Sequence, residues 1–324
     1  MFLHPSVILF FSLLFLTIFM IISVDSWLMM WLFLEINLLL FIPLLFSKKS
    51  KYQGEASLKY FINQAMASVL ILSSITFLSN NLNTMSNTLC LALSLKMGVA
   101  PLHGWLVSVS NSISWFSLWL LLIPQKVAPM MMMICLTTSA FSLLVLLISM
   151  TALMGAMGGL TAPAIKKMMA YSSISQMGWL MSALLCGRLI WSAYFAVYSA
   201  ITSTILITLS FMKANKINDF LCSKYSLLKT IMLFNMLAMA GLPPFTGFIM
   251  KMSLIIKLNQ IEQTLFLLPL IMSSLVSLYF YMRIFYTNFL SMTNLKKENQ
   301  MSSMEKMLIF INTASLPMGL IFLF

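Results

Sequence analysis

Charged residues are scarce in this sequence. Asp, Glu, Lys and Arg together make up 8% of its 324 residues, whereas hydrophobic residues make up 61%. About a quarter of the residues in a typical soluble domain are charged. The composition therefore excludes an ordinary soluble globular fold and predicts an all-α polytopic membrane protein.

Cysteine and histidine are also scarce, which bears on metals and cofactors. The four cysteines lie far apart and form no Cys-x-x-Cys pair, so neither a disulfide framework nor a metal site is indicated. With only His4 and His103, paired axial ligands for a haem have almost no candidates. Nucleotide-loop and flavin motifs are missing as well. The sequence thus predicts no metal site and no cofactor-binding site in this chain.

Long apolar runs dominate the sequence. A run of about 20 apolar residues is long enough to cross a bilayer as a helix. Because the amino end has neither a signal-peptide cleavage site nor an Arg-rich presequence, we expect the chain to begin with its first span. Eleven spans are predicted, at residues 3–23, 26–46, 57–79, 84–108, 113–135, 139–160, 165–186, 189–212, 228–258, 263–289 and 305–324.

Basic residues are distributed unevenly among the predicted loops. Only Arg188 and Lys257 fall on one side of the membrane. This asymmetry follows the positive-inside rule and places the amino terminus on the basic side and the carboxyl terminus on the other. The formal charge of +12 therefore indicates topology and not a nucleic-acid partner. The basic side collects Lys48, Lys49, Lys51, Lys59, Lys166, Lys167, Lys213, Lys216, Lys224, Lys229, Lys296, Lys297 and Lys306.

One stretch, residues 95–105 (LKMGVAPLHGW), combines a charge with a helix breaker inside an apolar run. A lysine such as Lys96 near the bilayer centre costs about 3 kcal/mol on insertion scales, which marks it as a functional candidate. Gly98 and Pro101 follow directly and can interrupt a membrane helix where a cavity or neighbouring helices satisfy the backbone. A charge beside a broken helix is typical of transporter binding sites.

A second stretch of this kind is residues 241–251 (GLPPFTGFIMK), with breakers at Gly241, Pro243 and Pro244 and a charge at Lys251. The two predicted broken helices are the fourth and ninth spans, five apart. A repeat of five spans contains an odd number of crossings, so its second copy is inverted, as in many secondary transporters. We therefore expect one membrane domain, 1–324, built from two inverted repeats and an appended last helix. These parts cover about 1–136, 139–290 and 305–324.

Few ionisable side chains remain inside the predicted spans: Glu35, Lys96, Lys126, Lys251 and, nearer a boundary, Arg283. Removal from water favours the neutral form of a lysine, whereas a nearby carboxylate favours the charged form. If Glu35 can approach or leave Lys96, that lysine becomes a switchable proton store. The sequence thus suggests a line of proton-transfer groups from Glu35 through Lys96 and Lys126 to Lys251.

Four motifs in this order resemble the NADH dehydrogenase subunit 2 family, the mitochondrially encoded antiporter-like subunits of respiratory complex I. They are residues 96–105 (KMGVAPLHGW), 125–129 (QKVAP), 171–179 (YSSISQMGW) and 241–251. The resemblance covers nearly the whole chain. It implies proton translocation coupled to NADH:ubiquinone reductase chemistry in other subunits.

The resemblance also implies roles for single residues. Glu35 resembles the glutamate that pairs with the lysine of the first broken helix, Lys96. Lys126 resembles the lysine that links two half-channels, and Lys251 the lysine of the second broken helix.

Two departures concern the secondary relay candidates, His103 and Gln176. Many relatives have histidine where this chain has Gln176, and glutamine can relay a proton through water but cannot hold one. The second departure is at His103, whose usual aromatic neighbours are replaced by Leu102 and Gly104.

A location and partners follow from the resemblance. It implies the mitochondrial inner membrane, with the amino terminus and basic loops in the matrix and the carboxyl terminus in the intermembrane space. The expected partners are other membrane-arm subunits, including further antiporter-like ones, accessory subunits and lipids such as cardiolipin. Flavin, iron–sulfur clusters and ubiquinone are expected in other subunits.

Structural interpretations compete with these roles. Glu35 and Lys96 can form a static buried pair, and Lys126 and Lys251 can extend their amines to the membrane surface. His103 can be an ordinary hydrogen-bonded side chain, and Arg283 an interfacial anchor. At the level of function, the alternatives are a cation/proton antiporter subunit of a non-respiratory complex and a structural spacer with inert buried charges. A redox-active quinone enzyme is a more distant alternative.

Overall fold

The computed structural model describes residues 5–46, 50–77, 82–216, 219, 226–243, 245–262, 264 and 266–292. Within these ranges the regular structure is helical, and the only β feature is an isolated antiparallel bridge between Ala164 and Lys216. The expected last span, 305–324, lies outside the described residues, as do His4 and Pro244.

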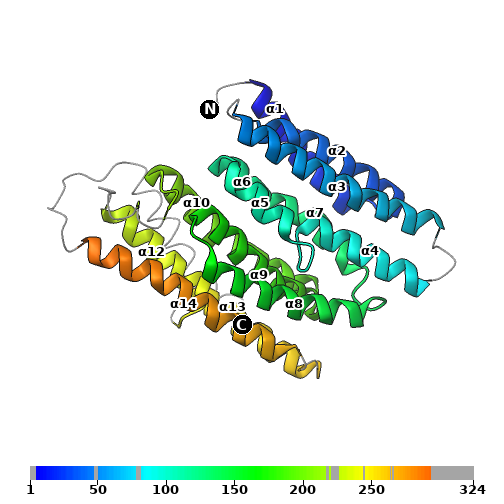
Figure 1. Ribbon diagram of the computed structural model, residues 1–324. Helices are drawn as coiled ribbons and strands as arrows, with labels where there is room; N and C mark the ends of the chain where they lie inside the picture. The colour runs from blue at the N-terminus through cyan, green and yellow to red at the C-terminus, as the bar shows by residue number, and fades with distance from the viewer. Residues whose placement is uncertain are drawn as a thin grey trace. The chain divides into compact units, whose positions relative to one another are not determined.

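The chain divides into two compact units, Met1–Met150 and Thr151–Phe324. In the first unit α2 packs between α1 and α3, and α3 also packs against α4 and α5 (Figure 1). α7 packs against α1, α4 and α6. The helices of this unit are α1 (Pro5–Ser23), α2 (Trp27–Leu45), α3 (Lys51–Phe77), α4 (Leu82–Met97), α5 (Gly104–Ser112), α6 (Trp115–Leu122) and α7 (Pro124–Ile134).

The boundary between the units falls within α8 (Phe141–Thr161). In the second unit α10 packs against α9, α12 and α13, and α14 packs against α9 and α12. These helices are α9 (Ile165–Cys186), α10 (Arg188–Met212), α12 (Ser226–Ala240), α13 (Thr246–Gln260) and α14 (Leu267–Met292).

Seven helical segments in the described part of the chain are long and apolar enough to cross a membrane, one of them formed by α6 and α7 together, which is consistent with a polytopic membrane protein. They are Pro5–Ser23, Trp27–Leu45, Lys51–Thr76, Trp115–Ile134, Phe141–Thr161, Arg188–Met212 and Leu267–Tyr286. The two expected broken spans appear as shorter helix pairs, α4 with α5 and α12 with α13. α3 begins at Lys51, earlier than the expected 57, because its first turns are polar and the apolar run starts later.

The outer helices carry apolar side chains on their exposed faces. Phe19 on α1, Leu39 on α2 and Val69 on α3 are each at least 60% exposed. Such a surface would be unusual for a soluble monomer, whereas lipid tails match it. Hydroxyl groups inside the helices mostly donate to a carbonyl of their own helix, as Ser74 does to Ile71 at 2.6 Å. These hydroxyl groups are thus satisfied within their own helix, as a bilayer requires.

A short connection after α10 is closed by a carboxylate. Asp219 Oδ2 accepts hydrogen bonds from the backbone N–H groups of Asn215 and Lys216, each at 2.8 Å. These two bonds hold the pKa of the Asp219 carboxyl below its usual value, because they favour the charged form. The Asn215 carbonyl in turn accepts from the Ile165 N–H at 3.0 Å, which ties the connection to the start of α9.

Candidate functional site

The first interruption separates α4 from α5. α4 ends at Met97, and Gly98 adopts a left-handed conformation with φ 71°. The Val99 N–H donates to the Ser94 carbonyl at 2.9 Å, and the Gly98 N–H to the Leu95 carbonyl at 3.1 Å. This pair of bonds is the Schellman motif, which ends a helix after a glycine. Two of the last carbonyls of α4 are thereby satisfied without water.

Side chains also donate to two carbonyls at the end of α4: that of Lys96, which the motif leaves open, and that of Leu95, which already accepts from the Gly98 N–H. Gln64 on α3 donates its amide nitrogen Nε2 to the Lys96 carbonyl at 3.0 Å. The indole Nε1 of Trp105, in the first turn of α5, donates to the Leu95 carbonyl at 3.0 Å. The end of α4 is therefore held from both sides, and the Lys96 side chain starts from a fixed backbone.

Glu35 on α2 faces Lys96 on α4. The Lys96 Nζ lies 3.8 Å from Glu35 Oε1, and the side chains are 4% and 29% exposed. This separation is within ion-pair range but too long for a good hydrogen bond. Glu35 Oε1 is itself buried and has no hydrogen-bond partner. The two groups are thus close enough to influence each other's charge without being locked together.

Lys126 lies beside a third interruption, which the sequence analysis did not anticipate. The expected span 113–135 is divided at Ile123 into α6 and α7, because Pro124 has no N–H to continue the helix. Lys126 occupies the first turn of α7, where its N–H donates to the Ile123 carbonyl at 3.2 Å. Its side chain is 1% exposed, so it does not extend to the surface of the unit.

Lys96 and Lys126 line the same cavity, which we call the first cavity. Its volume open to the centre of a water molecule is about 20 Å³, enough for about one water. An amide pair lines the same cavity, and the sequence did not predict the contact between its two members. Gln125 on α7 donates its Nε2 to Asn37 Oδ1 on α2 at 2.8 Å, and both residues line the cavity. The pair joins the helix that carries Glu35 to the helix that carries Lys126.

The second interruption repeats the backbone geometry of the first. α12 ends at Ala240, and Gly241 has φ 85°. The Leu242 N–H donates to the Leu237 carbonyl at 3.4 Å, and the Gly241 N–H to the Ala238 carbonyl at 3.1 Å. Both interruptions are therefore Schellman ends in which glycine supplies the left-handed residue.

Lys251 on α13 satisfies the carbonyls at the end of α12. Its Nζ donates to the Ala240 carbonyl at 2.9 Å and to the Met239 carbonyl at 3.4 Å. The same nitrogen lies 5.4 Å from the ring centre of Trp179, within the range of a cation–π interaction. Lys251 is 6% exposed and is thus held inside the second unit rather than extended to its surface.

Gln176 belongs to the same group of residues as Lys251. It accepts the Tyr194 hydroxyl hydrogen on Oε1 at 2.9 Å and donates its Nε2 to the Met239 carbonyl at 3.2 Å. Tyr194, Gln176, Met239 and Lys251 surround a second cavity, also of about 20 Å³, which we call the inner cavity. The Met239 carbonyl thus links Gln176 to Lys251.

The remaining candidates lie in less confined surroundings. His103 is half-buried at the start of α5, with Nδ1 3.2 Å from the Pro101 carbonyl oxygen, and it does not line the first cavity. Pro101 and Pro243 are both exposed. Arg283 on α14 donates its Nη1 to the Leu160 carbonyl at 3.3 Å, which fits a packing role. In the described ranges no group of three His, Cys, Asp or Glu side chains could hold a metal ion.

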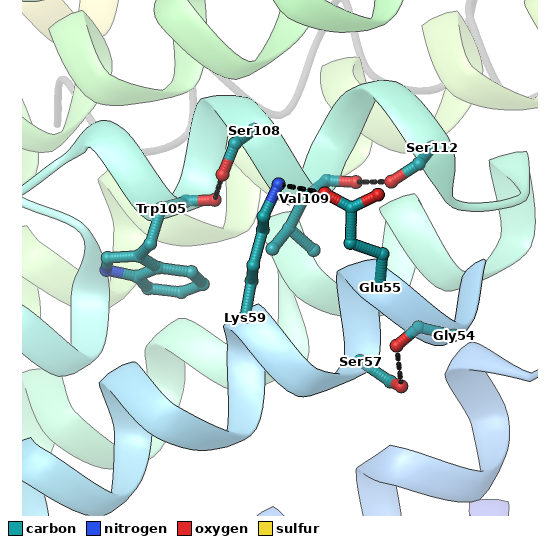
Figure 2. A network of polar contacts seen from close by, with 8 residues as sticks. All are labelled: Gly54, Glu55, Ser57, Lys59, Trp105, Ser108, Val109 and Ser112. Carbon is teal, nitrogen blue, oxygen red and sulfur yellow. Dashed lines mark hydrogen bonds and ion pairs between the residues drawn. The ribbon is translucent and has the colours of Figure 1, made fainter. Parts of the chain in front are cut away.

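Two other lysines contrast with these sites. Lys59 on α3 forms an exposed ion pair with Glu55 one turn earlier, beside Trp105 and Val109 of α5 (Figure 2). Exposed pairs of this kind contribute little to stability. Lys229, which we expected in a basic loop, is instead 0% exposed on α12. Hydropathy placed it near a helix end, and only the packing of the helices decides that it is buried.

The chain is similar in sequence to a known family of membrane proteins. Residues 24–277 match the family described as NADH:quinone oxidoreductase/Mrp antiporter, TM. The chain is 36% identical to NADH-ubiquinone oxidoreductase chain 2 of Anopheles gambiae, over 92% of each chain. It is 34% identical to the protein of the same name from Locusta migratoria, over 97% of this chain and 95% of the relative.

Solved structures share the fold at lower sequence identity. A chain of respiratory complex I from Thermus thermophilus with bound aureothin superposes with a TM-score of 0.87 at 21% identity, over 98% of this chain and 78% of that one. A chain of the Mrp complex from a Dietzia species gives a TM-score of 0.71 at 16% identity, over 90% of this chain and 70% of that one. At these identities the similarity concerns the fold alone.

Proposed function

This chain belongs to the NADH-ubiquinone oxidoreductase chain 2 family, and on that premise we propose that it moves protons through Glu35, Lys96, Lys126 and Lys251. It is an antiporter-like membrane subunit of an NADH:ubiquinone oxidoreductase. The proposal assigns electron transfer, with its flavin, iron–sulfur clusters and ubiquinone, to other subunits of the enzyme.

The observation that carries the proposal is the shared burial of Lys96 and Lys126 in one small cavity. A fixed ammonium group that served only packing would not need space for water next to a second amine. One water between two amines can accept a proton from the first and give a proton to the second. The side chains of Asn37, Gln64 and Gln125, which also line the cavity, supply further polar groups around that water.

Glu35 is the proposed switch of this step. Its carboxylate favours the charged form of Lys96 when it is close, and its withdrawal favours release of the proton. The separation of 3.8 Å and the absence of a hydrogen bond on Oε1 support a pair that can open. Lys251 is the proposed acceptor further along the route, with Gln176 as a neighbour that carries no proton of its own.

We extend the proposal to topology and location. The same Schellman end at Gly98 and at Gly241 supports two inverted repeats, about 1–136 and 139–290, within eleven spans. The proposed location is the mitochondrial inner membrane, with the amino terminus and basic loops in the matrix and the carboxyl terminus in the intermembrane space. The proposed partners are further antiporter-like and accessory subunits and lipids such as cardiolipin.

Replacement of Lys96 by methionine in the assembled enzyme tests the proposed function. We expect NADH oxidation to persist and proton pumping coupled to this subunit to be lost. Lys59→Met is the matched control, because Lys59 is exposed and lines neither cavity. Undiminished pumping in Lys96→Met would remove Lys96 from the route.

Two further measurements separate the alternatives. A joint Glu35→Gln and Lys96→Gln variant that keeps both assembly and pumping would favour a structural spacer. Sodium-dependent transport in the absence of NADH would favour a cation/proton antiporter. Gentle detergent extraction adds a direct check, since co-purification with flavin, iron–sulfur clusters and NADH oxidation is expected.

A further inference from the structure

A third cavity, which we call the outer cavity, lies next to the inner cavity between α10 and α13. It is lined by Leu189, Ile190 and Ala193 on the first turns of α10 and by Ser253 and Lys257 on α13. Leu189 and Lys257 are exposed, so this outer cavity reaches the surface of the second unit. Its volume open to the centre of a water molecule is about 180 Å³, which is room for several waters.

The inner and outer cavities share two lining residues, Tyr194 on α10 and Met250 on α13. Both residues are buried, each being 5% exposed. Lys251 lines the inner cavity but not the outer one. Tyr194 and Met250 therefore lie where the cavity lined by Lys251 borders the wider, surface-connected one.

The phenol is also the member of this pair that hydrogen bonds connect to Lys251. The Tyr194 hydroxyl donates to Gln176, Gln176 donates to the Met239 carbonyl, and Lys251 donates to the same carbonyl. A buried phenol needs a hydrogen-bond acceptor, and here Gln176 supplies it. This bond holds the Tyr194 ring where it lines both cavities.

We propose that Tyr194 is a gate between Lys251 and the outer cavity, held closed by its hydrogen bond to Gln176. The inference rests on the proposed function, in which Lys251 holds a proton that it can release. When the ring turns away, water from the outer cavity reaches the amine. The Lys251 ammonium then gives one proton to a water and becomes neutral, and that water becomes hydronium. Tyr194 keeps its own proton throughout and is a positioning residue.

The gate opens toward the side of the membrane that carries few basic residues. Lys257 borders the outer cavity, and Arg188 begins the helix that forms its other wall. On the proposed topology this is the intermembrane-space side, so the gate controls the exit of a proton from Lys251. Met250 is the flexible member of the pair, since methionine adapts its shape when a neighbour moves.

Cysteine accessibility in the assembled enzyme tests the gate independently of pumping. The native cysteines are replaced by serine, Lys251→Cys is introduced, and sealed vesicles are treated with a methanethiosulfonate that carries a quaternary ammonium group. We expect slow labelling when Tyr194 is present and labelling severalfold faster in Tyr194→Ala, from the Lys257 side only. The labelling rate of Tyr194→Phe is expected to lie between these two rates, because phenylalanine keeps the ring and loses the hydrogen bond to Gln176.

The controls separate the gate from a general loosening of the protein. Tyr279→Ala removes a tyrosine that is 66% exposed on α14, and we expect it to leave labelling unchanged. Met250→Ala opens the border between the two cavities from the other helix and replaces Tyr194→Ala if that variant fails to assemble. Labelling that is unchanged both by the Tyr194 variant and by Met250→Ala would overturn the gate.

A pumping measurement with Lys251 intact completes the test. Tyr194→Ala should keep NADH oxidation and lose part of its net pumping, because an open path returns protons. Faster labelling with full pumping would show that protons do not use this path and would overturn the proposal. Full pumping in Lys251→Met would instead refute the proposed role of Lys251, which is a different failure.

Discussion

The Glu35 carboxylate lies 3.8 Å from the Lys96 ammonium nitrogen, and its buried Oε1 has no hydrogen-bond partner. A static structural pair would gain most from direct, short hydrogen bonds, which give charged pairs much of their strength. This pair lacks that contact although both groups are within reach. The geometry is better suited to an interaction that changes during the reaction than to a permanent link between α2 and α4.

Glu35→Gln removes the charge from this relationship and nearly preserves the shape. We expect pumping to fall severalfold, since a change of about 1.4 kcal/mol in the interaction shifts a proton equilibrium about tenfold. Pumping is measured at matched rates of NADH oxidation. Glu35→Asp, which keeps the charge on a shorter side chain, should retain more activity than Glu35→Gln. Equal activity in the two variants would argue against a charge-dependent role.

Gly98→Ala and Gly241→Ala test the two interruptions. A left-handed conformation costs a residue with a Cβ about 1–2 kcal/mol. At Gly98 the new Cβ would also lie 2.7 Å from Leu106 Cδ1, and at Gly241 it would lie 3.0 Å from Lys251 Nζ. We expect a lower thermal unfolding midpoint for both variants, measured on the detergent-solubilised assembled enzyme.

The matched control for both glycines is Gly104→Ala, where a Cβ meets nothing within 4 Å. This control should leave the midpoint unchanged. At position 241 we further expect lost pumping, because the methyl group displaces the lysine. A Gly241→Ala enzyme with normal stability and normal pumping would contradict the geometry of the second interruption.

A double-mutant cycle tests the Asn37–Gln125 amide pair in the first cavity. Gln125→Leu leaves the buried Asn37 amide without its donor, which costs about 1–3 kcal/mol. Replacing both residues by leucine removes the unsatisfied group, so we expect the double variant to be less destabilised than the sum of the single variants. Thermal unfolding of the assembled enzyme measures this coupling. Strict additivity would indicate that the pair contributes no interaction energy.

The Asp219 connection has a defined pH dependence. Its two backbone hydrogen bonds lower the pKa of the carboxyl, so their contribution is present at neutral pH and is lost as the pH falls through this lowered pKa. Asp219→Asn should therefore weaken the hydrogen-exchange protection of the Asn215 and Lys216 amides at pH 7. The difference between the variant and the parent should vanish in acid. A difference that persists unchanged in acid would show that the carboxylate charge is not the cause.

Much of the helical framework could be predicted from the sequence. Helices α1, α2, α8, α9 and α10 begin and end within about two residues of the predicted spans, because apolar runs bounded by polar residues are a local property. The division at Ile123 was missed. Pro124 and Pro129 were both visible in the sequence, but proline is tolerated in membrane helices, so the sequence did not decide between a kink and a break.

The candidate site was predictable only in part. Lys96 and Lys251 stand out because each combines a charge, an apolar run and a nearby glycine or proline. Lys229 looked like a loop lysine and is fully buried. Tyr194 and Asn37 gave no signal, because polar and aromatic side chains of these types are common in helices. Gln125 belongs to the motif 125–129, but the sequence did not show that it pairs with Asn37.

By itself, the sequence determined that this is a helical membrane protein. It also determined which residues can end a helix within the membrane and which ionisable side chains lie inside the predicted spans. These properties depend on the cost of exposing polar groups to lipid and on the backbone freedom of glycine, and both act within a few neighbouring residues. Only the tertiary structure decided that Lys96 shares a cavity with Lys126 and that Tyr194 lines both the cavity of Lys251 and the outer cavity. Asn37 and Gln125 meet although 88 positions separate them, because such contacts depend on how whole helices pack.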